Sequence, residues 1–303
     1  MVFLDSEKKA MLAAIFAYFV FGLSFAFSKV ALEIVSPAEL LFFRFFLAFL
    51  LLNLMLISGK VKIYLKGKKL LPLLLLGILQ PVIYFYCENY GVQMTTATFS
   101  AVVIAVVPVV TLLGGVLFLK EIPSVWQILF MILSVVGVSA MALMKGDDGT
   151  VTLAGIILLL LAVVAEAAYV ALTRKLSVEY SVFERTYVMF AVGLVAFLPV
   201  CLWENGGNVA DLCSCLLHSE VLIAVLFLGA ACSFGAFLCL NYANTHLPVA
   251  RTAAFSNLTT VISVFAGVIF LKEDFTVFTL AASVMIIIGV WGVQHFKREE
   301  ETH

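Results

Sequence analysis

Long apolar runs separated by short polar segments dominate this chain of 303 residues. Each run is about 20 residues long, the length that an α-helix needs to cross the hydrocarbon core of a bilayer. The runs are continuous, unlike the alternating pattern of membrane β-strands, so we expect an all-α polytopic membrane protein. The pattern predicts ten transmembrane helices, at residues 10–31, 38–58, 70–91, 95–118, 124–144, 152–173, 182–203, 219–242, 248–271 and 276–296.

Composition supports lipid as the main solvent of these runs. Hydrophobic residues make up 64% of the chain and charged residues 12%, whereas a soluble domain has roughly half and a quarter. No basic stretch with interleaved aromatic residues suggests nucleic acid as a partner. The first apolar run ends at Ser28-Lys29 without a small-residue cleavage site, so we interpret it as a retained helix and not a signal peptide.

An internal repeat divides the chain into two halves. Residues 89–138, laid over 241–290 at a shift of 152 positions, match at 13 of 50 positions. Gly137, for example, falls on Gly289. We interpret the halves as five-helix repeats covering 8–145 and 151–297.

The first helix of each half aligns less cleanly. A shift of 145 positions pairs Ser36 with Ser181 and Glu39 with Glu184.

Loop charge differs between the halves. The segment 60–69 holds five lysines, and its counterpart 204–220 holds none. An odd number of helices per half places the second half upside down relative to the first. Because cytoplasmic loops are rich in Lys and Arg, we expect the 60–69 loop and both termini in the cytoplasm.

Four charged residues fall inside or at the edge of apolar runs: Lys29, Arg44, Glu88 and Glu166. A charge at that depth costs on the order of 2.5–3.5 kcal/mol on insertion scales, so each needs a reason. Arg44 and Glu88 have similar predicted depths. They form either a structural pair or part of a polar cavity that meets substrate, and Lys29 either snorkels to the interface or joins that cavity. Glu166 is either a hydrogen-bonded packing residue or a proton carrier.

Uncharged polar residues extend this set of candidates. Asn89 and Asn241 are repeat mates, Arg251 and Asn257 make the start of the run at 248–271 polar, and Tyr84 suits the floor of an apolar pocket. Interhelical hydrogen bonding is the alternative use of such groups. The candidates for the substrate path are therefore Lys29, Arg44, Tyr84, Glu88, Asn89, Glu166, Asn241, Arg251 and Asn257.

The sequence holds no phosphate-binding loop, no HExxH and no Ser/His/Asp arrangement with plausible spacing. We therefore expect no enzyme activity, no metal centre and no cofactor, with proton coupling left open.

Several motifs, in this order and spacing, resemble the EamA-like proteins of the drug/metabolite transporter superfamily. They are Lys29-Val30-Ala31-Leu32, Ser36-Pro37-Ala38-Glu39-Leu40 with Arg44, Glu88-Asn89-Tyr90-Gly91, Thr95-Thr96-Ala97 leading to Pro108, and the repeated Phe118-Leu119-Lys120-Glu121 and Phe270-Leu271-Lys272-Glu273 with Gly137 and Gly289. The resemblance covers about residues 8–296.

This resemblance implies two inverted five-helix repeats, a central cavity and alternating access. It also implies export or exchange of amino acids or other small metabolites. We therefore expect a secondary transporter of the bacterial inner (plasma) membrane, whose partners are a small-molecule substrate and the lipid bilayer. A non-transporting receptor or assembly scaffold with the same fold is the alternative, and a homodimer through the helices at 124–144 and 276–296 is left open.

Overall fold

The computed structural model of the chain describes residues 2–107, 109–110, 123–143, 151–176, 178–246, 249–272 and 276–296. Within these residues every regular element is helical, which confirms the all-α prediction. In chain order the elements are α1 (Val2–Ala31), α2 (Pro37–Ile57), α3 (Leu71–Gly77), η1 (Ile78–Ile83), α4 (Tyr84–Gln93), α5 (Ala97–Ile104), α7 (Val125–Leu143), α8 (Leu153–Leu176), α9 (Val182–Glu204), α10 (Val209–Ser214), η2 (Cys215–Leu217), α11 (Ser219–Leu226), η3 (Phe227–Ala236), α12 (Phe237–His246), α13 (Val249–Phe270) and α14 (Val277–His295).

Six described helical segments are long and apolar enough to cross a membrane, and they establish a multi-pass membrane protein. They are Glu7–Ala31, Pro37–Ile57, Leu71–Gln93, Leu153–Thr173, Val182–Glu204 and Ser219–Leu240. Shorter apolar helices lie at Val125–Gly137, Leu258–Phe270 and Leu280–Gly292. The expected span at 95–118 is described only as far as residue 110, and α5 forms its first part. The number ten therefore stays a prediction.

Two of the expected spans are interrupted in the middle. The path α3–η1–α4 is broken within η1 at Gln80, whose φ of −144° and ψ of 114° are not helical, and α11–η3–α12 passes through the π-helical segment η3. The repeat shift of 152 positions carries η1 onto residues 230–235, inside η3. Pro81 predicts an interruption in the first of these spans, whereas the sequence pattern predicts none in the second. Interrupted helices and π-helical turns are common at functional sites, so the two segments mark where polar groups should be sought.

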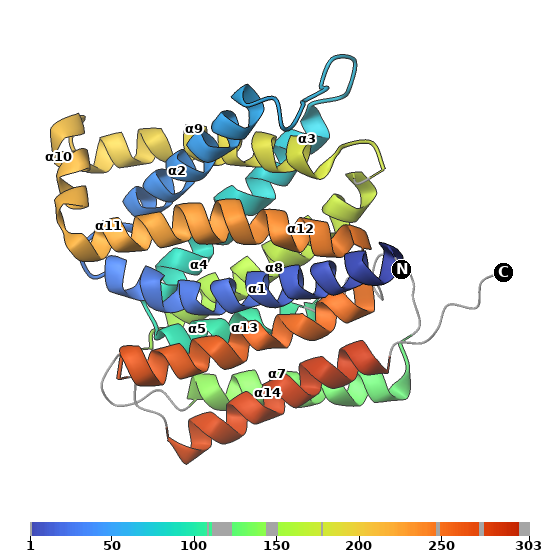
Figure 1. Ribbon diagram of the computed structural model, residues 1–303. Helices are drawn as coiled ribbons and strands as arrows, with labels where there is room; N and C mark the ends of the chain where they lie inside the picture. Colours follow the sequence, from blue (N-terminus) through green and yellow to red (C-terminus); the bar gives the residue numbers. More distant parts are fainter. Residues whose placement is uncertain are drawn as a thin grey trace.

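The long helices run alongside one another, and α7 and α14 form one edge of the bundle (Figure 1). At the other edge lie α2, α9 and α10 (Figure 1). Corresponding contacts link the two halves: α4 packs on α8 as α12 packs on α1, and α2 packs on η3 as α9 packs on η1. Each half therefore supplies matching surfaces to the other.

The contact between α7 and α14 shows the relation between the repeat mates directly. A Cβ added to Gly137 would lie 2.7 Å from Ile286 Cγ1, and one added to Gly289 would lie 2.3 Å from Ser134 Oγ. Ser134 and Ile286 are themselves repeat mates, and the Ser134 hydroxyl donates to the Ile286 carbonyl at 3.3 Å. The later residue on α7, Gly137, faces the earlier residue on α14, Ile286, whereas Ser134 faces Gly289. The two equivalent helices are therefore antiparallel and related by a local two-fold axis. The close approach requires glycine at both positions.

The starts of α2 and α9 confirm the weaker alignment between the halves. Ser36 and Ser181 are the N-caps, and each side chain accepts a hydrogen bond from the backbone N–H of the glutamate three residues on, Glu39 or Glu184. Each glutamate side chain accepts in return from the backbone N–H of its serine. These are capping boxes, which fix where the two helices begin.

Candidate functional site

Polar side chains from both halves meet in the middle of the bundle. We call this group the central polar cluster; its members are Arg44 on α2, Gln80 on η1, Tyr84 and Glu88 on α4, Glu166 on α8 and Ser233 on η3. The interrupted segments η1 and η3 each contribute a member. The carboxyl groups of Glu88 and Glu166 also lie within electrostatic range of one another. The cluster therefore joins three of the charged residues that the sequence singled out.

Arg44 is held by a hydroxyl group and an aromatic ring. Its side chain is 3% exposed, and its Nε donates to Ser233 Oγ at 2.8 Å. The guanidinium carbon lies 4.2 Å from the centroid of the Phe85 ring, in cation–π range. Arg44 and Glu88 do not form an ion pair, although their carboxylate and guanidinium are close enough to interact electrostatically. The structural pair that the sequence allowed is thus replaced by neutral partners.

Glu88 takes its hydrogen bond from within its own helix. Tyr84, one turn earlier on α4, donates its hydroxyl to Glu88 Oε1 at 2.9 Å. Both side chains are buried. The i, i+4 spacing places them on one face, and that face points toward the interior of the bundle. Tyr84 therefore belongs to the cluster as a hydrogen-bond donor as well as an apolar wall.

Glu166 is bound by a residue that sequence reasoning missed. Gln80 Nε2 donates to Glu166 Oε2 at 2.8 Å. The Gln80 backbone has φ −144° and ψ 114°, which breaks the helical path. Gln80 is 4% exposed, and its Oε1 has no partner among the described residues. The signal was present in the sequence: proline at 81 disfavours helical geometry at the residue before it, inside an apolar run.

Two other candidates are associated with α4: Lys29, on α1, contacts the end of that helix, and Asn89 lies within it. Lys29 Nζ donates to the carbonyls of Val92, at 3.0 Å, of Gln93, at 3.2 Å, and of Thr95. A cation there satisfies carbonyl groups that the helix end leaves without an intrahelical donor. Asn89 donates to the Phe85 carbonyl at 2.9 Å, and its buried Oδ1 has no described partner. Lys29 is thus placed to stabilise the end of the helix, apart from the central polar cluster.

The remaining candidates belong to the second half. Asn241 lies on α12, and Arg251 and Asn257 lie on α13. Their side chains fall outside the described part of the chain, so their place on the substrate path stays a prediction.

Comparison with known proteins identifies the family of the chain. A model described as the EamA-like transporter family matches residues 8–143 and again 153–294. "Uncharacterized transporter YcxC" of Bacillus subtilis (strain 168) is 31% identical over 289 residues, covering 94% of this chain and 93% of the relative. "Pseudopaline exporter CntI" of Pseudomonas aeruginosa is 27% identical over 203 residues, covering 67% of this chain and 69% of the relative.

A solved crystal structure matches the fold. It covers 94% of this chain and 97% of its own, with a TM-score of 0.62 and 15% sequence identity. The helical architecture therefore recurs in a protein whose sequence has diverged widely.

Proposed function

This chain belongs to the EamA-like transporter family, and from that membership and the central polar cluster we propose that it is a secondary transporter of small metabolites. It exports or exchanges a molecule such as an amino acid by alternating access between its two halves. The pseudopaline exporter among its similar proteins fits export as the direction of net flow. The family is one of transporters and not of enzymes, so the chemistry is binding, release and proton movement.

The proposed architecture is ten transmembrane helices in two inverted five-helix repeats, at 8–145 and 151–297. The antiparallel packing of α7 on α14 supports inversion, since both are the fifth helix of their half. The matching interruptions at η1 and η3 support a site between the halves. In carriers of this kind the substrate site lies near the midplane, where helices from both repeats are interrupted.

One observation carries the proposal: two carboxyl groups lie inside an apolar bundle, and each is bound by a neutral donor. Glu88 accepts from Tyr84 and Glu166 accepts from Gln80. Arg44 lies within electrostatic range of Glu88, but one arginine balances only one of the two carboxylates, so the pair must take up a proton or a second cation to avoid a large desolvation cost. A substrate ammonium group or a proton meets this need, so we propose an amine-bearing metabolite and proton coupling, with no other cofactor.

The proposed orientation follows from loop charge. The loop at 60–69 and both termini face the cytoplasm of a bacterial inner membrane. In the structure that loop contacts Glu184 at the start of α9, while Glu204 at the other end of α9 contacts Ser36. About 20 residues of helix, or roughly 30 Å, separate the two ends of α9. This separation supports a position of the 60–69 loop on one side of the membrane and of the segment that begins at Glu204 on the other. A homodimer stays a prediction.

Flux through proteoliposomes tests the function. Vesicles are loaded with a mixture of unlabelled amino acids, and uptake of each labelled amino acid is followed with and without an imposed pH gradient. We expect exchange by the wild type and a loss of about tenfold or more in Glu166→Gln and Glu88→Gln, because neither amide can bind a proton or pair with ammonium.

Glu33→Gln is the matched control, since Glu33 is exposed and lies outside the cluster. Size-exclusion profiles and thermal midpoints verify that the variants fold. Full flux in both cluster variants would refute the assigned roles. Absence of flux for every amino acid and amine in the wild type would favour the receptor or scaffold alternative.

A further inference from the structure

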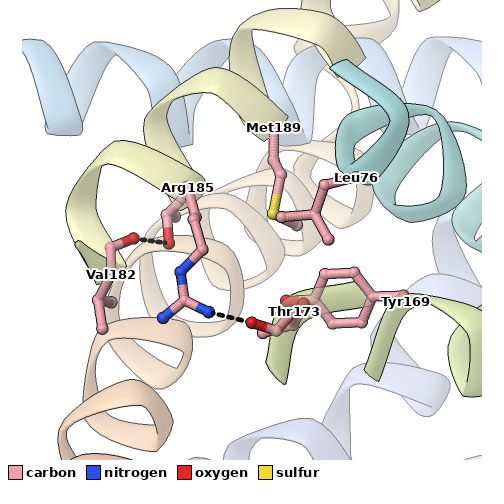
Figure 2. Close-up of a pocket in the computed structure, with 7 residues that line it drawn as sticks. Leu76, Tyr169, Thr173, Val182, Arg185 and Met189 are labelled. Atoms are coloured by element: carbon pink, nitrogen blue, oxygen red, sulfur yellow. Dashed lines mark hydrogen bonds between the residues drawn. The ribbon is translucent and has the colours of Figure 1, made fainter. Parts of the chain in front are cut away.

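A second polar site lies away from the central polar cluster, at the end of the bundle that carries the 60–69 loop. It is a cavity of about 10 Å³, roughly the room that one water molecule occupies. Its walls come from α3, α8 and α9, as Figure 2 shows. The lining residues are Leu76, Tyr169, Thr173, Val182, Arg185, Thr186 and Met189.

Arg185 is the charged member of this wall. Its side chain is 8% exposed. One guanidinium nitrogen, Nη1, donates to the Thr173 carbonyl at 3.0 Å, and Nε has no partner among the described residues. The buried Thr173 hydroxyl lies in the same wall, beside the Tyr169 hydroxyl. A guanidinium donor without a described partner and a hydroxyl group thus border one small cavity.

No described carboxylate pairs with Arg185. The neighbouring acid in the chain, Glu184, is engaged by Lys68 at 2.9 Å and by the backbone N–H of Tyr64 at 2.9 Å. A buried arginine normally has an anionic partner, because an uncompensated charge away from water is costly. Its five N–H donors form a fork that matches the two oxygens of a carboxylate. The unfilled position therefore suits a small anion.

A polar stripe leads from this cavity toward the middle of the bundle. Thr173, Tyr169 and Glu166 follow one another on α8 at helical spacing, so they share a face. Tyr169 is within electrostatic range of both Glu166 and Arg185. The rise along α8 from Thr173 to Glu166 is about 10 Å. The stripe therefore connects the cavity to Glu166, one of the two carboxyl groups that we propose to bind the amine of the substrate.

We propose that Arg185 and Thr173 form an anion-binding subsite that receives the carboxylate of the substrate before the molecule reaches the central polar cluster. This proposal rests on the proposed function for the path of the substrate, and on the geometry of Arg185 for the binding itself. The rise of about 10 Å is too long for one α-amino acid to contact both sites at once. Binding is thus sequential: the carboxylate at Arg185 first, then the amine at Glu166.

The cavity must widen to admit a carboxylate, and its walls allow this. Met189 and Leu76 close one side (Figure 2). Methionine is unbranched and changes rotamer readily, so a small displacement there enlarges the space without disturbing the backbone.

Thermal unfolding of the purified full-length protein tests the subsite without any transport. Propionate and the neutral propionamide are titrated at constant ionic strength. We expect propionate to raise the unfolding midpoint and propionamide to leave it unchanged, because only a ligand bound by the folded state stabilises it. Arg185→Gln should weaken the apparent propionate affinity by about tenfold or more. Arg185→Lys should give an intermediate loss, since lysine keeps the charge but loses the fork.

Lys175→Gln is the matched control, because it removes an exposed cation at the same end of α8. Should Arg185→Gln fail to fold, Thr173→Val and Arg185→Lys give the same readout. Stabilisation of the wild type by chloride but not propionate overturns the carboxylate subsite. Equal propionate affinity in the wild type and both Arg185 variants overturns it as well. Propionate binding without amino-acid flux would retain the subsite and reject the transport function.

Discussion

A capping-box glutamate links the two halves at each end of the bundle, but the two glutamates have different partners. At one end Glu39, at the start of α2, contacts the segment that follows α9. At the other end Glu184, at the start of α9, contacts the loop that follows α2. Each glutamate belongs to a capping box in its own half and reaches across to the other half. We call these contacts the Glu39 clasp and the Glu184 clasp.

The partners of the two glutamates differ in charge. Glu184 accepts from Lys68 Nζ and from the Tyr64 backbone N–H, both at 2.9 Å. Glu39 accepts from the neutral amide of Asn205 at 2.8 Å. Both glutamates accept as carboxylates, and a buried hydrogen bond to a charged group contributes about 1.5–3 kcal/mol. Glu184 is buried and has two donors from the other half, whereas Glu39 is half-buried and has one, Asn205, so the Glu184 clasp should be the stronger. The internal repeat therefore determines where the two clasps lie, and the partner side chains determine how strongly each clasp stabilises the fold.

Removal of the Glu184 side chain should have the largest effect. Glu184→Ala deletes the acceptor of both Lys68 and Tyr64 and one half of a capping box, so the free energy of unfolding should fall by about 1.5–3 kcal/mol. Hydrogen exchange at the Tyr64 amide should also accelerate, because its acceptor is gone. Glu184→Gln, which keeps an acceptor for that amide, is the control. Unchanged exchange at Tyr64 in the alanine variant would contradict the clasp.

The equivalent change at the other end should cost less. Glu39→Ala should lower the free energy of unfolding by about 0.5–1.5 kcal/mol, because Asn205 keeps its second hydrogen bond, to the Cys201 carbonyl. Glu39→Gln should behave nearly as the wild type, since Asn205 still finds an oxygen. Thermal midpoints of Glu39→Ala and Glu184→Ala, measured side by side, check the ranking. Equal losses would show that charge at the clasp makes no difference.

The smallest expected effect is a difference in how salt changes the stability loss caused by a mutation at each clasp. Lys68→Gln is expected to cost about 1 kcal/mol or less at low salt, because the lysine is partly exposed. Near 1 M salt, where screening acts within about 3 Å, that cost should shrink. Asn205→Ala should cost the same at both salt concentrations, because its bond involves a neutral donor. A salt-independent Lys68→Gln would mean that the ion pair contributes little.

Much of the fold was predictable from periodicity and repetition. Run length and apolar composition predicted the helices, and the matches of Gly137 to Gly289 and of Glu39 to Glu184 recur as equivalent contacts. Such features are local or depend on spacing along the chain. Pro81 predicted the break in η1. The π-helical segment η3 was not predicted, because a change of helical type leaves the hydrophobic pattern of a continuous apolar run almost unchanged.

The candidate site was predictable only in part. Arg44, Tyr84, Glu88 and Glu166 do gather at the centre, but their partners Ser233 and Gln80 were missed. Arg185, bordered by charged neighbours at a helix start, gave no sign that it is buried without an acid. Pairing between side chains depends on which faces of two helices meet.

By itself the amino-acid sequence determined the lipid environment, the helices and the duplication. The length of an apolar run and the recurrence of residues at a fixed spacing are properties of the linear chain. The tertiary structure alone decided that Lys29 ends on backbone carbonyls, that Arg44 meets Ser233 and not Glu88, and that Arg185 borders a cavity. The physical reason is that sequence sets the depth of a residue along its helix, whereas packing sets the rotation of each helix about its axis. That rotation chooses the partner of every buried charge.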